Sequence, residues 1–95
     1  MTDLWMNLSD KIDRILDLIC MAEENLPITQ YDSKKNSYYI TDIERLEKDA
    51  NSIREKLPNQ IDKEIYDSIN DALKQIHDAL IRMLRMFLQD SKFED

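Results

Sequence analysis

The amino-acid sequence predicts an all-α fold: a three-helix bundle with coiled-coil-like heptad seams, formed by a single domain over residues 1–95. Two observations predict this fold. Apolar residues recur at alternating spacings of three and four in three separate stretches, which is typical of helices that pack against other helices. The composition agrees, because the chain has no Gly, no Val and only two Pro but is rich in Leu, Ile, Met, Lys, Glu and Asp.

The first helix is expected over about residues 3–26. Thr2 is a suitable N-cap, and Asp3 in the first turn faces the positive end of the helix dipole. Pro27 should end this helix, because proline lacks an amide hydrogen and its ring disfavours a helical residue before it. The apolar seam of this helix consists of Trp5, Leu8, Ile12, Ile15, Ile19, Ala22 and Leu26.

The second helix is expected over about residues 42–57. Its start is predicted by Thr41 and Glu44, which have the spacing of a capping box, and its end by Pro58. The apolar seam of this helix consists of Ile43, Leu46, Ala50, Ile53 and Leu57.

The third helix is the longest and is expected over about residues 60–90, with Asn59 as its N-cap. The link over residues 57–60 is short, so the second and third helices should form an antiparallel hairpin. The apolar seam of the third helix is predicted to be Ile65, Ile69, Ala72, Ile76, Ala79, Met83 and Met86.

Residues 27–40, between the first two helices, are expected to form a loop that is long for a bundle. Strand-like residues flank a polar middle, so the alternatives are a short β-hairpin and an ordered loop lying over the bundle. The segment contains Tyr31, Tyr38 and Tyr39. These tyrosines are candidate partner-binding residues, because tyrosine offers a large contact area at low entropic cost. The alternative is that their rings cover the open end of the core.

The end of the third helix is unusually apolar from Ala79 to Leu88. At about 1.5 Å per residue, the second helix would be roughly 25 Å long and the third roughly 45 Å. The apolar segment should therefore extend beyond the second helix. It could be covered by the first helix and the loop, by a second copy of the chain, or by a different protein. We predict a homodimer about a two-fold axis, with Phe87 turned inward and with contacts from Ile81, Leu84, Arg85 and Leu88.

Acidic residues recur every seven positions on the outer side of the first helix, at Asp3, Asp10, Asp17 and Glu24. They form either an ordinary solvated face or an acidic ridge that docks a basic protein surface or imitates nucleic-acid phosphates. In the second case Asp10 and Asp17 would bind the partner, mainly by raising the association rate.

The net charge of −7, from 20 acidic and 13 basic residues, argues against direct nucleic-acid binding and against binding to an anionic membrane. It favours basic proteins as partners, and it also keeps a small protein in solution. The N-terminus has no basic region followed by an apolar run, so no secretory signal is expected. Cys20 is the single cysteine and cannot form an internal disulfide, which predicts a reducing, cytoplasmic location.

No motif predicts catalysis, a cofactor or a metal site. His77 is the only histidine and has no ligand partner at helical spacing, and Cys20 has no base nearby in the sequence. A chain without Gly cannot form a phosphate-binding or dinucleotide-binding glycine loop. We therefore predict that the protein is not an enzyme.

The expected function is a non-enzymatic protein-interaction module that inhibits or neutralises a partner by occupying its surface. In outline the chain is similar to small acidic helical proteins of bacteria and phages, such as immunity proteins, antitoxins, secretion chaperones and inhibitors of host systems; this is an analogy of fold alone. The alternatives are a structural homodimer or assembly adaptor, and a small-molecule sensor with a pocket between its helices.

Overall fold

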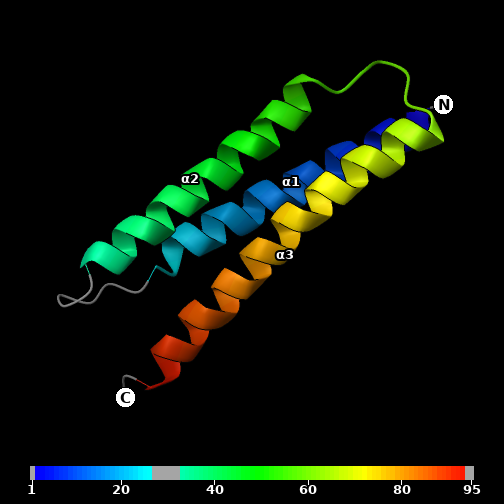
Figure 1. The fold of residues 1–95 in the computed structure, drawn as a ribbon. Helices are drawn as coiled ribbons and strands as arrows, with labels where there is room; N and C mark the ends of the chain where they lie inside the picture. Colours follow the sequence, from blue (N-terminus) through cyan, green and yellow to red (C-terminus); the bar gives the residue numbers. More distant parts are fainter. Residues whose placement is uncertain (1, 27–32, 94–95) are drawn as a thin grey trace.

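The protein is an all-α three-helix bundle in its computed structural model, which describes residues 2–26 and 33–93 and the side chains of residues 4–26 and 39–89. Its helices are α1 (Thr2–Glu24), α2 (Ser33–Glu55) and α3 (Lys63–Phe93). The described residues contain no strand. The bundle is a rod with principal extents of 51 × 21 × 17 Å (Figure 1). The predicted fold class is thus confirmed.

The second and third helices run antiparallel, as predicted, but the packing is centred on α1. α1 and α3 run parallel to each other, and α2 runs antiparallel to both (Figure 1). The most extensive contact is between α1 and α3, the next is between α1 and α2, and the contact between α2 and α3 is the smallest. α2 and α3 therefore form an antiparallel pair that is held together largely through α1.

The seam predicted for α1 is the one that the structure buries. Leu8, Ile12, Ile15, Ile19 and Ala22 are at most 2% exposed, whereas Trp5, at the start of the helix, is 39% exposed. Burial of each of the larger side chains stabilises the fold by roughly 1.5–3 kcal/mol. α1 is therefore the helix on which the other two pack.

The end of α1 is capped without a glycine. The backbone N–H of Asn25 donates to the carbonyl oxygen of Met21 at 3.0 Å, and the side-chain amide of Asn25 donates to the same oxygen at 2.7 Å. One of the carbonyl groups that a helix end leaves unpaired is satisfied in this way. Pro27, the predicted stop, lies outside the described residues.

The predicted start of the second helix is wrong. α2 begins at Ser33, so residues 33–40 are helical and form neither a loop nor half of a hairpin, and Thr41 lies inside the helix. The physical reason is a tertiary contact: Tyr39 packs on the core, and its ring meets the ring of Phe87 edge-on, with centroids 5.0 Å apart and an interplanar angle of 74°. Such aromatic pairs contribute about 0.5–1.5 kcal/mol beyond their area.

The break predicted around Pro58 and Asn59 is confirmed, but Asn59 is not the helix cap. α3 begins at Lys63, and the Oδ1 atom of Asp62 accepts a hydrogen bond from the backbone N–H of Ile65 at 2.9 Å. That is the geometry of an N-cap residue and its third helical position. The third helix therefore starts three residues later than predicted.

The core face of α3 is rotated relative to the prediction. Met86 is 43% exposed, and Ala72 and Ala79 are only partly buried. The rotation follows from the packing order, because α3 contacts α1 more extensively than α2 and turns toward it. The residues of α3 that the structure buries are Leu73, Ile76, Leu80, Met83, Leu84 and Phe87.

Candidate functional site

Asp10, Asp17 and Glu24 form the acidic face of α1. All three are exposed, because α1 packs on its neighbours through the opposite side. None of them forms an ion pair with a described residue. Asp13 differs, because it pairs with Arg54 of α2. The side chain of Asp3 lies outside the described part of the chain. The predicted acidic ridge is thus solvent-facing along the described length of α1.

The last turn of α1 concentrates negative charge at a negative helix end. Glu23 and Glu24 are exposed there, and this turn contains no basic residue. The C-terminus of a helix carries about half a negative charge from its aligned peptide dipoles, so an acidic side chain there costs about 0.3–1 kcal/mol. The sequence places two carboxylates where the backbone alone disfavours them.

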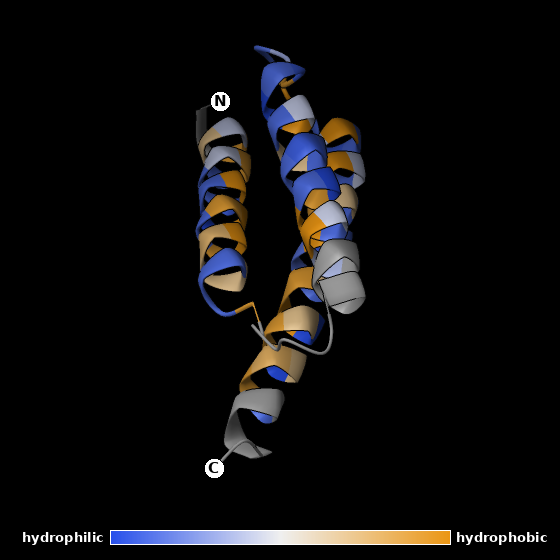
Figure 2. Cartoon of the chain, turned by 90° about the vertical axis from the view of Figure 1, so that its left-hand side faces the viewer, coloured by the Kyte–Doolittle hydropathy of each residue, from blue (hydrophilic) through white to orange (hydrophobic). Residues whose placement is uncertain are grey.

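Three exposed apolar side chains lie toward this end of the bundle, whereas Trp5 and Met6 are exposed at the opposite end, at the start of α1. We call Met21, Met86 and Leu88 the apolar end; they are 49%, 43% and 54% exposed. The C-terminal turns of α3 run past the end of α1, and the α3 ribbon is largely hydrophobic in that region (Figure 2). Carboxylates and large apolar groups are therefore both exposed where α1 ends.

The residues predicted to contact a partner on α3 do not share one environment. Arg85 and Leu88 are exposed and Ile81 is partly buried, but Leu84 is only 7% exposed and belongs to the core. The placement of Leu84 on the outer face is therefore wrong, and the cause is the rotation of α3 toward α1. Phe87 is 2% exposed, so its predicted inward orientation is confirmed.

Of the predicted partner-binding tyrosines, Tyr39 is partly buried against the core and covers Phe87. It is thus a packing residue, as the alternative interpretation of the tyrosines expected. Tyr31 lies outside the described residues, and so does the side chain of Tyr38.

A polar cluster that the sequence did not predict joins α1 to the first half of α3. The hydroxyl of Tyr66 donates to Oδ1 of Asn7 at 2.7 Å. The ammonium of Lys11 donates to the hydroxyl oxygen of Tyr66 at 3.1 Å and also to Oδ1 of Asn70. We call Asn7, Lys11, Tyr66 and Asn70 the polar cluster. Its hydrogen bonds align the parallel helices α1 and α3 at the edge of their contact.

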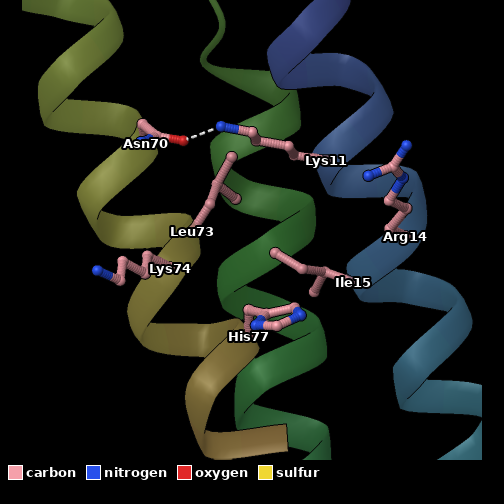
Figure 3. Close-up of a pocket in the computed structure, with 7 residues that line it drawn as sticks. All are labelled: Lys11, Arg14, Ile15, Asn70, Leu73, Lys74 and His77. Atoms are coloured by element: carbon pink, nitrogen blue, oxygen red, sulfur yellow. Dashed lines mark hydrogen bonds between the residues drawn. The ribbon is translucent and has the colours of Figure 1, made fainter. Parts of the chain in front are cut away.

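A cavity of about 280 Å³ opens in the groove between α1 and α3, next to the polar cluster. Lys11 reaches across the groove toward Asn70, and the almost completely buried side chains of Ile15 and Leu73 lie below this hydrogen bond (Figure 3). The ammonium of Lys74 points away from α1 in the same view. The residues that line the cavity are Lys11, Arg14, Ile15, Asn70, Leu73, Lys74 and His77.

Little in the sequence predicts this cavity, because it depends on which side of α3 faces α1. Asn70 and Lys74 belong to the face that the predicted seam turned outward. One pattern in the sequence could have predicted the polar contact. Tyr66 and Asn70 are four residues apart at the edge of the predicted α3 seam, and α1 has a lysine one residue from its own seam.

The other candidate residues, His77 and Cys20, do not come together in one site. His77 lies on the cavity wall, with Nδ1 3.5 Å from Oδ1 of Asp78. Cys20 is exposed. Among the described residues there is no group of three or more His, Cys, Asp or Glu that could hold a metal ion. None of the helices, over the part of the chain that is described, is long and apolar enough to cross a membrane.

Comparison with known proteins adds no information about the site. Searches against protein-family models, curated proteins and solved structures find no match to this chain.

Proposed function

We propose that the protein is a non-enzymatic, cytoplasmic interaction module that binds a basic partner protein and blocks it by covering its surface. The observation that carries the proposal is the last turn of α1, where Glu23 and Glu24 are exposed at a negative helix end without a basic residue. Basic groups of a partner would relieve the unfavourable electrostatics of this turn.

The acidic face extends this negative surface along α1. Asp10 and Asp17 are exposed and unpaired among the described residues, so their charge is available to steer a basic partner. Steering of this kind acts on the association rate and weakens as salt is added.

The apolar end supplies the anchors that steering lacks. Met21 and Leu88 leave about half of their surfaces in solvent, and Met86 only slightly less. Burial of such side chains in a complex provides affinity, and methionine adapts its shape to the partner. A partner that covers this end would meet carboxylates and apolar groups together, which is the composition of a polar rim around an apolar centre.

The experiment compares three forms of the chain as bait in an extract of cells that carry its gene. The forms are the wild type, the double variant Glu23→Gln with Glu24→Gln, and a control with the same charge change on α2, Glu44→Gln with Glu47→Gln. We expect wild type and control to retain a basic protein at low salt, and the Glu23/Glu24 variant to lose it. Addition of the purified chain to that protein should then inhibit its activity.

The proposal fails if all three baits retain the same proteins, or if the retained protein keeps full activity in the complex. For a retained partner, Asp10→Lys with Asp17→Lys should slow association and reduce its dependence on salt while leaving the dissociation rate nearly unchanged. Association kinetics measured at two salt concentrations test this part.

A homodimer through the end of α3 is the second candidate, and the 54% exposure of Leu88 favours it. The contact surface would be smaller than the sequence predicted, because Leu84 is used inside the bundle. Light scattering of the wild type should then give twice the mass of the chain, and Leu88→Glu should give the single mass with unchanged helicity. A wild-type chain of single mass at high concentration excludes this candidate.

A further inference from the structure

We propose that the groove between α2 and α3 is the contact surface for a second copy of the chain, packed antiparallel about a two-fold axis. This surface differs from the acidic face of α1 and from the end of α3, so the inference does not rest on the proposed function. It follows from the shape of the groove, the order of its charges and the position of an exposed methionine.

The groove exists because α2 and α3 pack on α1 more than on each other. Their mutual contact is the smallest of the three, and a cavity of about 620 Å³ lies between them. The described residues that line it all belong to these two helices. Leu46 and Ile76 in this lining are almost completely buried. The other apolar residues of the lining keep part of their surfaces in solvent; they are Ile53, Ala72 and Ala79.

Four charged residues line the groove, and they form two layers. Arg45 and Asp49 are four residues apart on α2, and Asp78 and Arg82 are four apart on α3. The two helices are antiparallel, and the edge-on ring contact described above fixes their relative level (Figure 1). At about 1.5 Å per residue from that contact, both arginines lie about 8–9 Å along the helices and both aspartates about 14–15 Å. The groove therefore has a basic layer and, about one helical turn further, an acidic layer.

This order of charges is self-complementary under a two-fold axis. An axis that crosses the groove at a right angle, between the two layers, places Arg45 and Arg82 of one copy opposite Asp49 and Asp78 of the second copy. Each helix then lies antiparallel to the same helix of the second copy. An axis along the rod would instead place arginine opposite arginine, which is unfavourable. The charges thus select the antiparallel arrangement.

Within one chain these four charges have only weak partners. Asp49 forms no ion pair with a described residue. Arg45 pairs with Asp42 at 3.7 Å, but the two side chains are 68% and 48% exposed, so this pair contributes little. Nε of Arg82 donates to the backbone carbonyl oxygen of Asp78 at 3.4 Å, which leaves the Asp78 carboxylate to the neighbouring histidine at 3.5 Å. All four are therefore available for ion pairs with a second copy.

The charge and the size of this face also suit a second copy. The chain has a net charge of −7, whereas the described charges that line the groove sum to zero. α2 has 23 residues, so the face that it shares with α3 is about 35 Å long and, at about 10 Å per helix, about 20 Å wide. That footprint of roughly 700 Å² per copy is close to the roughly 800 Å² per partner of a standard interface.

Met86 supplies an apolar contact in the same arrangement. Ala72, Ala79 and Met86 recur every seven residues on α3, so they share the side of the helix that borders the groove. The proposed axis passes at the level of Leu80, and it brings Met86 of one copy to within about 3 Å of the level of Ala72 of the other. Met86 is 43% exposed, and the small side chain of Ala72 leaves room for it. The dimer would thus bury a side chain that the single chain leaves in water.

The experiment reverses the charges of the groove and then pairs the variants with each other. Arg45→Glu with Arg82→Glu makes both layers acidic, and Asp49→Arg with Asp78→Arg makes both basic. Light scattering of the purified wild type should give twice the mass of the chain. Each variant alone should give the single mass, with the dissociation constant raised at least about a hundredfold, because like charges then face each other. An equal mixture of the two variants should recover the double mass, because opposite charges face each other again.

Two controls make the test specific to the groove. Lys48→Glu with Lys74→Glu makes the same charge change as the first variant at exposed positions of α2 and α3 outside the lining, and it should keep the double mass. Leu88→Glu should keep it as well, which separates this interface from a dimer through the end of α3. Circular dichroism confirms that each form is helical.

Four results would overturn the proposal. They are a single mass for the wild type at high concentration, which would leave the groove to a different occupant; reversed variants that dimerise as tightly as the wild type; a mixture of the two variants that keeps the single mass; and dissociation of the dimer by Leu88→Glu. The mass of the wild type can overturn the proposal even if a variant does not fold. Every measurement uses the purified chain alone, so the result is independent of the basic partner in the proposed function.

Discussion

The two halves of α3 are held by different chemistry. In the first half, Tyr66 and Asn70 form hydrogen bonds with polar side chains of α1 at the edge of the core. In the second half, Leu80 and Phe87 are almost completely buried, and Phe87 meets Tyr39 of α2 edge-on. The first half also buries Leu73 and Ile76, so polar contacts with α1 are added there to an apolar core that continues through the second half.

The two halves of α3 therefore contribute differently to the stability of the fold and to the alignment of its helices. Apolar burial has no preferred direction, so the second half of α3 supplies free energy of folding without fixing one alignment of the helices. Hydrogen bonds have defined donors and acceptors, so the polar cluster favours one register between the parallel helices α1 and α3. The cavity lies directly beside this cluster, where the side chains align the helices without filling the groove.

The largest effect is expected from a charge in the apolar half. Leu80 is fully buried, so Leu80→Asp places a carboxylate in the core without a partner. We expect loss of at least about 4 kcal/mol, which is most of the stability of a small domain at the lower end of the ordinary range. Circular dichroism with urea titration measures this effect. The control Gln75→Asp, at an exposed position of the same helix, should melt close to the wild type.

The sequence was sufficient for the part of the fold that rests on local patterns. The seam from Leu8 to Ala22 predicted the buried face of α1, because the apolar spacing there is regular and has one solution. The break at Pro58 was predicted for a similar reason, since proline acts on the backbone of its own neighbours. The exposed acidic face followed directly from the same helical spacing.

The remaining features depend on contacts between distant residues. Tyr39 and its neighbours have strand-like propensities, and the contact of Tyr39 with Phe87, far along the chain, favours their helical conformation. The apolar residues of α3 allow more than one buried face, and its packing on α1 selects the face that includes Leu84. The cavity, which requires both helices in place, could not be predicted from either helix alone.

A smaller but still large effect is expected at the aromatic contact of the second half. Phe87→Ala should cost about 3–5 kcal/mol, because it removes a buried ring and leaves a cavity. Tyr39→Ala should cost less, since Tyr39 is only partly buried. A double-mutant cycle by urea denaturation should give a coupling of about 0.5–1.5 kcal/mol. Coupling near zero would mean that the contact does not account for the early start of α2.

The polar half should respond much more weakly to the loss of its central hydroxyl. Tyr66→Phe removes the group that accepts from Lys11 and donates to Asn7, and we expect a loss of about 1 kcal/mol. Lys11→Met should cost a similar amount, and the double variant should cost less than the sum because the residues share a hydrogen bond. If Tyr66→Phe destabilised the protein as much as Phe87→Ala, the distinction between the two halves would be wrong.

The smallest effect is expected at the ion pair between Asp13 and Arg54, which shows what a polar contact contributes when it is open to solvent. The side chains are 61% and 41% exposed, so water and salt weaken their attraction. Arg54→Met should change the free energy of unfolding by less than about 1 kcal/mol, and added salt should reduce the difference further. The polar cluster, in which Lys11, Tyr66 and Asn70 are part-buried, should lose more than this pair in parallel urea titrations, and its loss should depend less on salt. Equal losses would indicate that the cluster is as solvated as the ion pair, and that the register of α1 and α3 is set by apolar packing alone.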